Sequence, residues 1–232
     1  PSVEAYSRVM DAANSYDSRQ TDNTHTFETF LVWSKKTEKS EWWAQFVPNL
    51  SLLSRTMHYI CGSVDTMFTK HSTLYNMYST HIRWRSTDHK YEFEFHYGVN
   101  GQAPDMSMYV NVLNTTDPLN ITMANANLKS SYKHEIISHF LRIYPKQQLM
   151  WIIETQYIPT HNAIAMGYTY DKTTGQRVFR PDNVNGNWQG KLALGGSGPF
   201  NKKHTLSFKA MGGVDYEQSV DLIDLAGSMV SN

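Results

Sequence analysis

The feature that most constrains this chain is an alternation of residue types with a period of two. It is clearest from Tyr91 to Val99, where odd positions carry aromatic rings or valine and even positions carry charges, histidine or glycine. Successive side chains of a strand point to opposite faces, so this segment presents an almost purely aromatic face and a polar face. Helical periodicity is nearly absent from the sequence. The pattern therefore predicts an all-β protein.

Seven further segments alternate more weakly, which predicts eight strands in total. They cover residues 27–33, 42–52, 78–85, 132–140, 149–157, 188–194 and 206–210. Short polar turns are expected at 35–40, 86–90, 145–148 and 199–203, whereas long connections are expected at 54–73, 100–130, 160–185 and after Gly213. Short and long connections therefore alternate along the whole chain.

This alternation of connections is itself informative. Compact soluble domains seldom hold several loops longer than about 12–15 residues. Membrane barrels combine short periplasmic turns with long extracellular loops as a rule. We therefore predict the wall of an antiparallel, up-and-down transmembrane β-barrel.

Large aromatic residues cluster beside the expected short turns. Such rings favour the boundary between membrane and water, where one edge is wet and the body is apolar. Rings are also common strand formers, so they could simply cap a soluble core. We interpret them as a membrane girdle composed of Trp33, Trp42, Trp84, Tyr91, Tyr144, Trp151 and Phe200.

The composition excludes several other classes of protein. The 21 basic and 21 acidic residues balance, which speaks against a nucleic-acid partner. A single cysteine, Cys61, excludes an internal disulfide framework, and we expect it to be a free thiol in the loop 54–73. No run approaches the roughly 18 apolar residues of a membrane helix. The mean hydropathy of −0.51 does not detect membrane strands, because their polar faces lower the average.

The sequence holds no nucleophile elbow, phosphate loop, HExxH motif or paired-cysteine site. We therefore expect no enzymatic activity, no cofactor and no metal centre. A Lys or Arg on the lipid face near the bilayer centre costs about 2–4 kcal/mol, so charged strand residues should face the barrel interior. The expected lumen-facing residues are Glu92, Glu94, His96, Glu154, Gln156, Gln189 and Lys191. They could bind a ligand or, alternatively, hold the wall together through cross-strand pairs.

The expected outer loops are rich in asparagine and tyrosine, which suit sugars or peptides through amide hydrogen bonds and ring stacking. The same residues are common in loops for reasons of turn geometry. The candidate ligand contacts are Tyr109, Asn114, Asn120, Asn125, Asn127, Tyr168, Tyr170 and Arg180.

Two of these loops also carry motifs. The segments Asp117–Thr122, Ala124–Lys129 and Tyr132–His134 together resemble the NPLNITxGNPNLKPEYSH signature of barrel domains in TonB-dependent outer-membrane receptors, especially those of Bacteroidetes. Residues 171–188 are similar to another passage of that family that enters a strand. The chain has Ala124 and Ala126 where the family usually has glycine and proline. The resemblance covers about residues 20–215.

This resemblance implies a nutrient receptor in the bacterial outer membrane. Its implied partners are outer-membrane lipid, the remainder of the same barrel with its plug, the inner-membrane TonB complex and a surface lipoprotein. No plug, energy-coupling box or aromatic-ended last strand is recognisable, and family barrels have about 22 strands. We therefore expect residues 1–232 to form a single internal slice of a larger barrel, with residues 1–23 and 214–232 in outer loops.

Two alternatives remain open from the sequence. The first is a soluble, secreted β-sandwich that binds carbohydrate through exposed rings, which would bury its apolar strand faces between two sheets. The second is a small outer-membrane barrel that closes on its own eight strands. Self-closure would require hydrogen bonds between segments 24–34 and 203–214.

Overall fold

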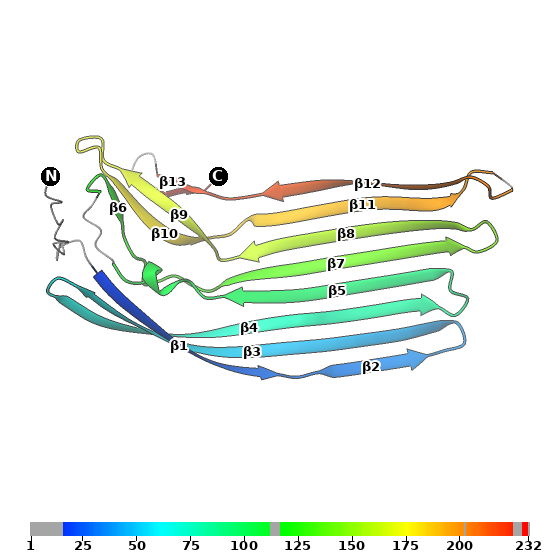
Figure 1. The fold of residues 1–232 in the computed structure, drawn as a ribbon, viewed down its shortest axis with the longest axis horizontal. Helices are drawn as coiled ribbons and strands as arrows, with labels where there is room; N and C mark the ends of the chain where they lie inside the picture. Colours follow the sequence, from blue (N-terminus) through cyan, green and yellow to red (C-terminus); the bar gives the residue numbers. More distant parts are fainter. Residues whose placement is uncertain (1–15, 112–116, 202, 225–228, 232) are drawn as a thin grey trace, which may run out of the picture.

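The computed structural model describes residues 16–111, 117–201, 203–224 and 229–231, and one long antiparallel sheet dominates it (Figure 1). The strands of this sheet are β1 (Tyr16–Glu28), β2 (Leu31–Lys36), β3 (Ser40–Cys61), β4 (Val64–Ser86), β5 (Tyr91–Gln102), β7 (Ser131–Tyr144), β8 (Leu149–His161), β11 (Asn187–Pro199) and β12 (Ser207–Gln218). The smaller elements are a 3₁₀ turn η1 (Met106–Met108) and strands β6 (Asn120–Thr122), β9 (Ala163–Tyr170), β10 (Arg177–Val184), β13 (Leu222–Asp224) and β14 (Met229–Ser231).

The main sheet confirms the predicted up-and-down architecture. Its strands follow the order β1-β3-β4-β5-β7-β8-β11-β12, and β2 pairs with β3 beside β1. All eight predicted strands are present, and every pairing in this sheet is antiparallel.

The first predicted strand is split into β1 and β2, and Pro48 explains the break. Thr29, which lies between β1 and β2, donates its backbone N–H to the carbonyl oxygen of Pro48 at 3.2 Å. In an antiparallel sheet, the N–H and C=O groups of one residue point to the same neighbouring strand. Because the Pro48 carbonyl oxygen points to the edge strand, the N–H group that proline lacks would have pointed there too. The edge strand therefore loses one ladder bond at this point.

The predicted long loop at 54–73 is wrong. Strands β3 and β4 run on through it, pairing from Ser40 with Ser86 to Cys61 with Val64. The tight turn between them contains Gly62 with φ of 58°, a conformation that favours glycine. Strand β3 has 22 residues and extends about 70 Å. A tilted strand needs only about 9–11 residues to cross a membrane, so β3 is much longer than one crossing.

Two further boundaries differ from the sequence prediction. Strand β1 begins at Tyr16, so residues 16–23 belong to the sheet, whereas residues 1–15 lie outside the described part of the chain. Strand β12 continues to Gln218, beyond the predicted end of the sheet near Gly213. The pair Gly212–Gly213 weakened the strand signal there, because glycine is a poor strand former.

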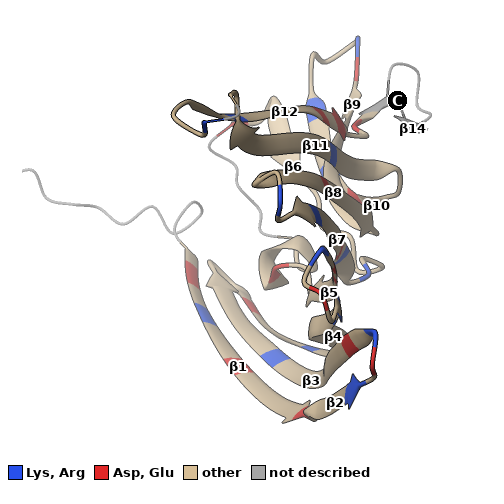
Figure 2. Ribbon diagram, turned by 90° about the vertical axis from the view of Figure 1, so that its right-hand side faces the viewer, with Lys and Arg blue, Asp and Glu red and all other residues tan. Residues whose placement is uncertain are grey.

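The sheet is a single curved layer (Figure 2). Within the described residues, no pairing joins β1 or β2 to β12, so these strands form an open sheet. No second sheet covers either face of the long strands, which makes the β-sandwich alternative wrong for the described chain. The smaller sheet β6-β10-β9 lies at the end of the main sheet away from the short turns (Figure 1). We call this end the outer end.

The buried core is small and lies mainly at the outer end. One cluster joins Met57 and Tyr59 of β3 to the 103–130 segment through Met106, Tyr109 and Leu128. A second cluster contains Ala163, Val184, Val220 and Leu222. The long strands between the short turns and these clusters contribute little to the core, so their side chains must be stabilised by something other than a protein interior.

Candidate functional site: the two faces of the sheet

The main sheet has one face formed largely by aromatic and aliphatic side chains, which we call the ring-rich face. Cross-strand register aligns its residues in rows, because directly opposed residues share a face. One row contains Trp42, Trp84, Phe93, Phe140, Ile153, Leu194 and Gly212, and the next contains Ala44, Ile82, Phe95, Ser138, Thr155, Leu192 and Val214. The alternation seen in the sequence is therefore maintained across seven strands.

The ring-rich face is exposed. Ile153 and Leu192 have 40% and 43% of their surface accessible, although both are aliphatic and lie in the middle of strands. Exposed apolar patches of this extent on a soluble protein mark an interaction surface.

Charged residues are almost completely absent from this face. The segments between the short turns and the outer end are β2, β5, β7, β8, β11, β12 and the parts of β3 and β4 at 40–47 and 79–86. Among the Lys, Arg, Asp and Glu residues described there, register assigns only Lys35 and Arg142 to the ring-rich face. Both lie close to short turns. The opposite face, which we call the polar face, therefore carries nearly all the charge.

The seven predicted girdle residues gather at the short-turn end. Trp42 and Trp84 are directly opposed, with ring centroids 6.3 Å apart. Tyr91 and Trp151 flank Arg142 in register. Trp33 and Tyr144 share the ring-rich face by register, and Phe200, in the last short turn, contacts the ring of Phe208 at 5.4 Å.

A second group of rings at the other end of the ring-rich face was not predicted. The Trp188 ring lies between those of Tyr157 and Tyr216 in tilted contacts, with centroid distances of 5.6 and 4.9 Å. Gly190 makes this possible, since a Cβ there would lie 2.9 Å from the Trp188 ring. The signal available in the sequence was a tryptophan at the start of a strand, next to a long connection.

The polar face carries arginine–glutamate ion pairs between β4 and β5 and a histidine–glutamate contact between β7 and β8. Arg83 Nε lies 2.6 Å from Glu94 Oε1, and Arg85 Nη2 lies 3.0 Å from Glu92 Oε2. His139 Nδ1 lies 3.4 Å from Glu154 Oε1. Alternating signs on neighbouring strands stabilise the sheet by cross-strand pairing. Three of the predicted lumen residues, Glu92, Glu94 and Glu154, thus have structural partners.

The other predicted lumen residues share this face. His96 and Gln156 both oppose Ile137 in register, and Lys191 opposes Gln156. Lys191 also approaches Asp215 at 4.0 Å. Gln189 donates a hydrogen bond to Glu217 at 3.0 Å. All seven residues therefore lie on the polar face, and their position in a barrel lumen stays a prediction.

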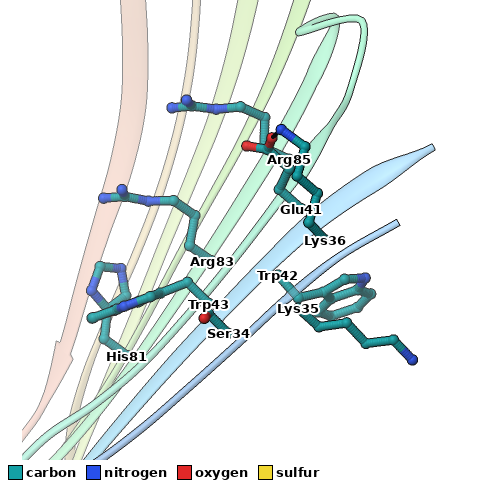
Figure 3. A pocket seen from close by; sticks show the side chains of 9 residues that line it. All are labelled: Ser34, Lys35, Lys36, Glu41, Trp42, Trp43, His81, Arg83 and Arg85. Carbon is teal, nitrogen blue, oxygen red and sulfur yellow. Dashed lines mark ion pairs between the residues drawn. The ribbon is translucent and has the colours of Figure 1, made fainter. Parts of the chain in front are cut away.

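An open hollow of about 550 Å³ lies where β2, β3 and β4 meet. His81, Arg83 and Arg85 project to one side of the sheet in this region, whereas Trp42 and Lys35 project to the other (Figure 3). Trp43 packs its ring edge against His81 on the polar side, with centroids 5.2 Å apart. The lining thus combines basic side chains and two tryptophan rings with the acidic residue Glu41, and Lys36, Arg83 and Arg85 are already paired with carboxylates.

The two motif-bearing segments pack against each other at the outer end. Strand β6 pairs in parallel with β10, and Met123 donates its backbone N–H to the Phe179 carbonyl oxygen at 2.8 Å. Asn183 donates its side-chain amide to the carbonyl oxygens of Lys129 and Asn162. The side chain of Asn183 therefore holds two separate segments of backbone together.

The structure divides the predicted ligand contacts into buried and exposed residues. Tyr109 and Asn125 are only 5% and 3% exposed, and both bond within the protein, so their burial favours a structural role. Burial raises the pKa of the Tyr109 hydroxyl. Asn114 lies outside the described residues. The exposed or half-exposed residues are Asn120, Asn127, Tyr168, Tyr170 and Arg180.

Asn120 also has a structural partner. Its side-chain amide donates to Asp117 at 2.7 Å, which holds the pKa of that carboxyl below its ordinary value. Tyr168 and Arg180, in contrast, line a small pocket of about 180 Å³ together with Met123, Val178 and Leu222. Two exposed candidates are thus brought together on the β9–β10 hairpin.

A larger pocket of about 310 Å³ lies between β1, β3, η1 and the β9–β10 hairpin. Four methionines line it, Met57, Met108, Met123 and Met166, and its lining contains no charged residue. Methionine side chains adapt their shape and contact aromatic groups favourably. This pocket is therefore suited to an uncharged, largely apolar group.

Two other features are absent from the described residues. No group of three or more His, Cys, Asp or Glu side chains could hold a metal ion. No helix in this part of the chain is long and apolar enough to cross a bilayer.

Comparisons with known proteins identify the family. The model of the outer membrane protein β-barrel family matches residues 79–230, more than half of the chain. The crystal structure of the outer membrane transporter YddB from Escherichia coli is similar at 10% sequence identity with a TM-score of 0.41. That similarity covers 84% of this chain and 34% of the transporter chain, so the present chain spans about a third of it. No curated protein sequence matches the chain.

The all-β antiparallel fold and the family match lead to the same assignment. A sheet with one ring-rich face almost free of charge is what a membrane-spanning wall requires. The chain belongs to the outer membrane protein β-barrel family and is located in the bacterial outer membrane.

Proposed function

We propose that the chain forms part of the barrel wall of a TonB-dependent receptor that takes up a nutrient across the outer membrane. In this proposal the ring-rich face contacts lipid acyl chains and the polar face lines an aqueous interior. The observation that carries the proposal is the segregation of charge. Between the short turns and the outer end, Lys35 and Arg142 are the only described Lys, Arg, Asp or Glu residues that register assigns to the ring-rich face, and both lie near short turns. Charges are least costly at these boundary positions.

Strand lengths support this orientation. A tilted strand crosses a bilayer in about 9–11 residues, and β5, β8 and β12 contain 12, 13 and 12 residues. The extensions of β3 and β4 beyond Pro48 would then stand outside the membrane. In the β3 extension Arg55, Met57 and Tyr59 are buried, and Met57 and Tyr59 pack against the 103–130 segment, as expected for the wall of a vestibule.

The TonB-dependent assignment rests on the resemblance of residues 117–134 and 171–188 to receptor motifs. The close packing of these two segments supports it, because it gives both motifs one structural purpose at the outer end. The remainder of the barrel, its plug, the TonB complex and a surface lipoprotein are the partners that this proposal requires. The chain itself catalyses no reaction in this account.

The ligand would first be captured at the outer end. The pocket lined by four methionines and the neighbouring pocket of Tyr168 and Arg180 both open there. Met123 lines both pockets and is 46% exposed, so it is available to an incoming molecule. The paired polar residues deeper in the wall would hold the barrel and its plug.

A growth experiment tests the proposed function. The gene for the full-length protein is deleted in its host, and growth is measured on single limiting nutrients with and without a functional TonB complex. The proposal predicts at least one nutrient whose uptake needs both the protein and TonB. Uptake that needs the protein but continues unchanged without TonB would contradict the receptor assignment.

A further inference from the structure

Arg142 is unusual because it is the only arginine described on the ring-rich face between the short turns and the outer end. It lies on β7, two residues before the strand ends at Tyr144. Register places it between Tyr91 of β5 and Trp151 of β8. The position is therefore surrounded by the rings of the girdle.

Two tyrosine rings hold the guanidinium of Arg142. Its Cζ atom lies 3.6 Å from the centroid of the Tyr91 ring and 4.7 Å from that of Tyr144. Tyr91 is itself supported by Phe140, with ring centroids 6.4 Å apart. Stacked in this way, the planar guanidinium loses little further conformational freedom when it binds a ligand.

The same guanidinium lacks an anionic partner. Its Nη1 atom is buried without a hydrogen-bond acceptor, and no ion pair or side-chain hydrogen bond joins it to the described residues. The acidic residues of the adjacent strands, Glu92 and Glu154, lie on the polar face and are paired with Arg85 and His139. A buried or half-buried arginine normally pairs with an anion, so the unpaired Nη1 atom favours an anionic partner from outside the described chain.

The membrane supplies an anion at this position. Rings of a girdle lie at the level of lipid headgroups, where a phosphodiester is within reach of an arginine on the lipid face. The forked guanidinium binds two phosphate oxygens in parallel, which a lysine cannot do. The positive charge of Arg142, its level at the lipid headgroups and the forked shape of its guanidinium all suit a lipid phosphodiester.

We propose that Arg142, clamped by Tyr91 and Tyr144, binds the phosphodiester of a glycerophospholipid in the periplasmic leaflet of the outer membrane. The choice of leaflet rests on the proposed orientation, in which the short turns face the periplasm. The bound lipid would seal the wall against the bilayer at the turn between β7 and β8. Lipid A, which belongs to the opposite leaflet, should not be preferred.

The test uses the full-length protein purified in a mild detergent. Dioleoyl phosphatidylethanolamine is titrated into the wild type and into Arg142→Gln, and bound lipid is counted by native mass spectrometry. We expect about tenfold weaker binding by the variant, as for loss of one charge-assisted hydrogen-bond pair. Lys209→Gln is the matched control, because it removes a cation near the same end of the sheet from the polar face.

Further probes distinguish the sources of the binding. Dioleoylglycerol, which lacks phosphate, should bind wild type and Arg142→Gln equally. Arg142→Lys, which retains the charge without the fork, should bind phosphatidylethanolamine with intermediate affinity, and Tyr144→Leu should weaken binding while Arg142 remains. These two variants keep the test valid if Arg142→Gln does not fold.

Several results would overturn the proposal. Equal binding by Arg142→Gln and Lys209→Gln would remove Arg142 from the site. Competition by inorganic phosphate at low concentration would indicate a free-anion site, and tighter binding of lipid A would assign the other leaflet. Because these measurements use purified protein, they are independent of whether nutrient uptake requires TonB.

Discussion

Asn125 donates its side-chain amide to the backbone carbonyl oxygen of Pro181 at 2.9 Å, across 56 residues of sequence. The same side chain accepts a hydrogen bond from the backbone N–H of Asn127 at 3.0 Å. Pro181 is among the largest fully buried residues of the described chain. This one amide therefore joins the two motif-bearing segments and orders the turn that follows it.

Replacing Asn125 should loosen the outer end without affecting the long strands. Asn125→Ala leaves the buried Pro181 carbonyl oxygen without its donor, which costs about 1–3 kcal/mol. Limited proteolysis should then cut the 103–130 segment faster than in the wild type. Asn127→Ala, at an exposed neighbouring position, is the control and should leave the cleavage rate unchanged. Equal rates for Asn125→Ala and the wild type would show that this bond does not order the segment.

Introducing a charge should have opposite consequences at two adjacent isoleucines. Ile153 lies on the ring-rich face and Ile152 on the polar face. Ile153→Arg should destabilise the barrel by about 2–4 kcal/mol, the cost of arginine near the bilayer midplane. Ile152→Arg should cost less than half as much. The comparison is made by urea unfolding in lipid vesicles, and similar losses for both variants would contradict the assignment of faces.

Gly196 should be required for the position of Trp151 in the girdle. A Cβ at Gly196 would lie 2.6 Å from the Trp151 ring, so the ring must move in Gly196→Ala. Overpacking of this kind costs about 1–3 kcal/mol. Gly212→Ala is a matched control, because a Cβ there meets no atom within 4 Å. Thermal unfolding should separate the two variants, and equal midpoints would argue that Trp151 is not packed on Gly196.

The turn after β4 should give one pH-dependent contribution to stability. Hydrogen bonds from the Lys90 ammonium and the Ser86 hydroxyl lower the pKa of Asp88 from 3.8 to about 2. Since this pKa is depressed in the folded state, the stabilisation is present above about pH 4 and is lost as the pH falls towards 2.

The variant Asp88→Asn isolates this contribution. It should be less stable than the wild type at pH 5 and equally stable near pH 2, as measured by thermal unfolding at each pH. Glu38→Gln removes a carboxylate from the neighbouring short turn and serves as the control. A stability difference between Asp88→Asn and the wild type that stays constant from pH 5 to pH 2 would contradict this account.

The sequence predicted the strands well where the two faces of the sheet differ in polarity. From Tyr91 to Val99, one face is almost entirely aromatic and the other is polar, so the alternation was visible. Beyond Pro48, in the extension that we propose stands outside the membrane, β3 lacks this contrast. Arg55 and His58 there lie on opposite faces, so the pattern that defines a strand weakened and the predicted loop at 54–73 was wrong.

The candidate site was predicted less completely, because burial in loops depends on long-range contacts. Nothing adjacent to Asn125 in sequence indicates that Pro181 will cover it, and Tyr109 is buried by β3 residues about fifty positions earlier. The pocket of four methionines joins segments that only the fold brings together. Parity along a strand was sufficient to assign the seven predicted lumen residues to one face of the sheet, since it needs no tertiary information.

The most direct test of the account is the environment of single spin labels at successive positions of β8. Cys61 is replaced by serine in the full-length protein, and cysteines for labelling are introduced one at a time from position 151 to 156. Collision rates with oxygen, which dissolves in lipid, and with a water-soluble nickel chelate are then measured in vesicles. The account predicts that labels at 151, 153 and 155 collide mainly with oxygen, whereas labels at 152, 154 and 156 collide mainly with the nickel chelate. Preferential collision of the odd-numbered labels with the nickel chelate would contradict it.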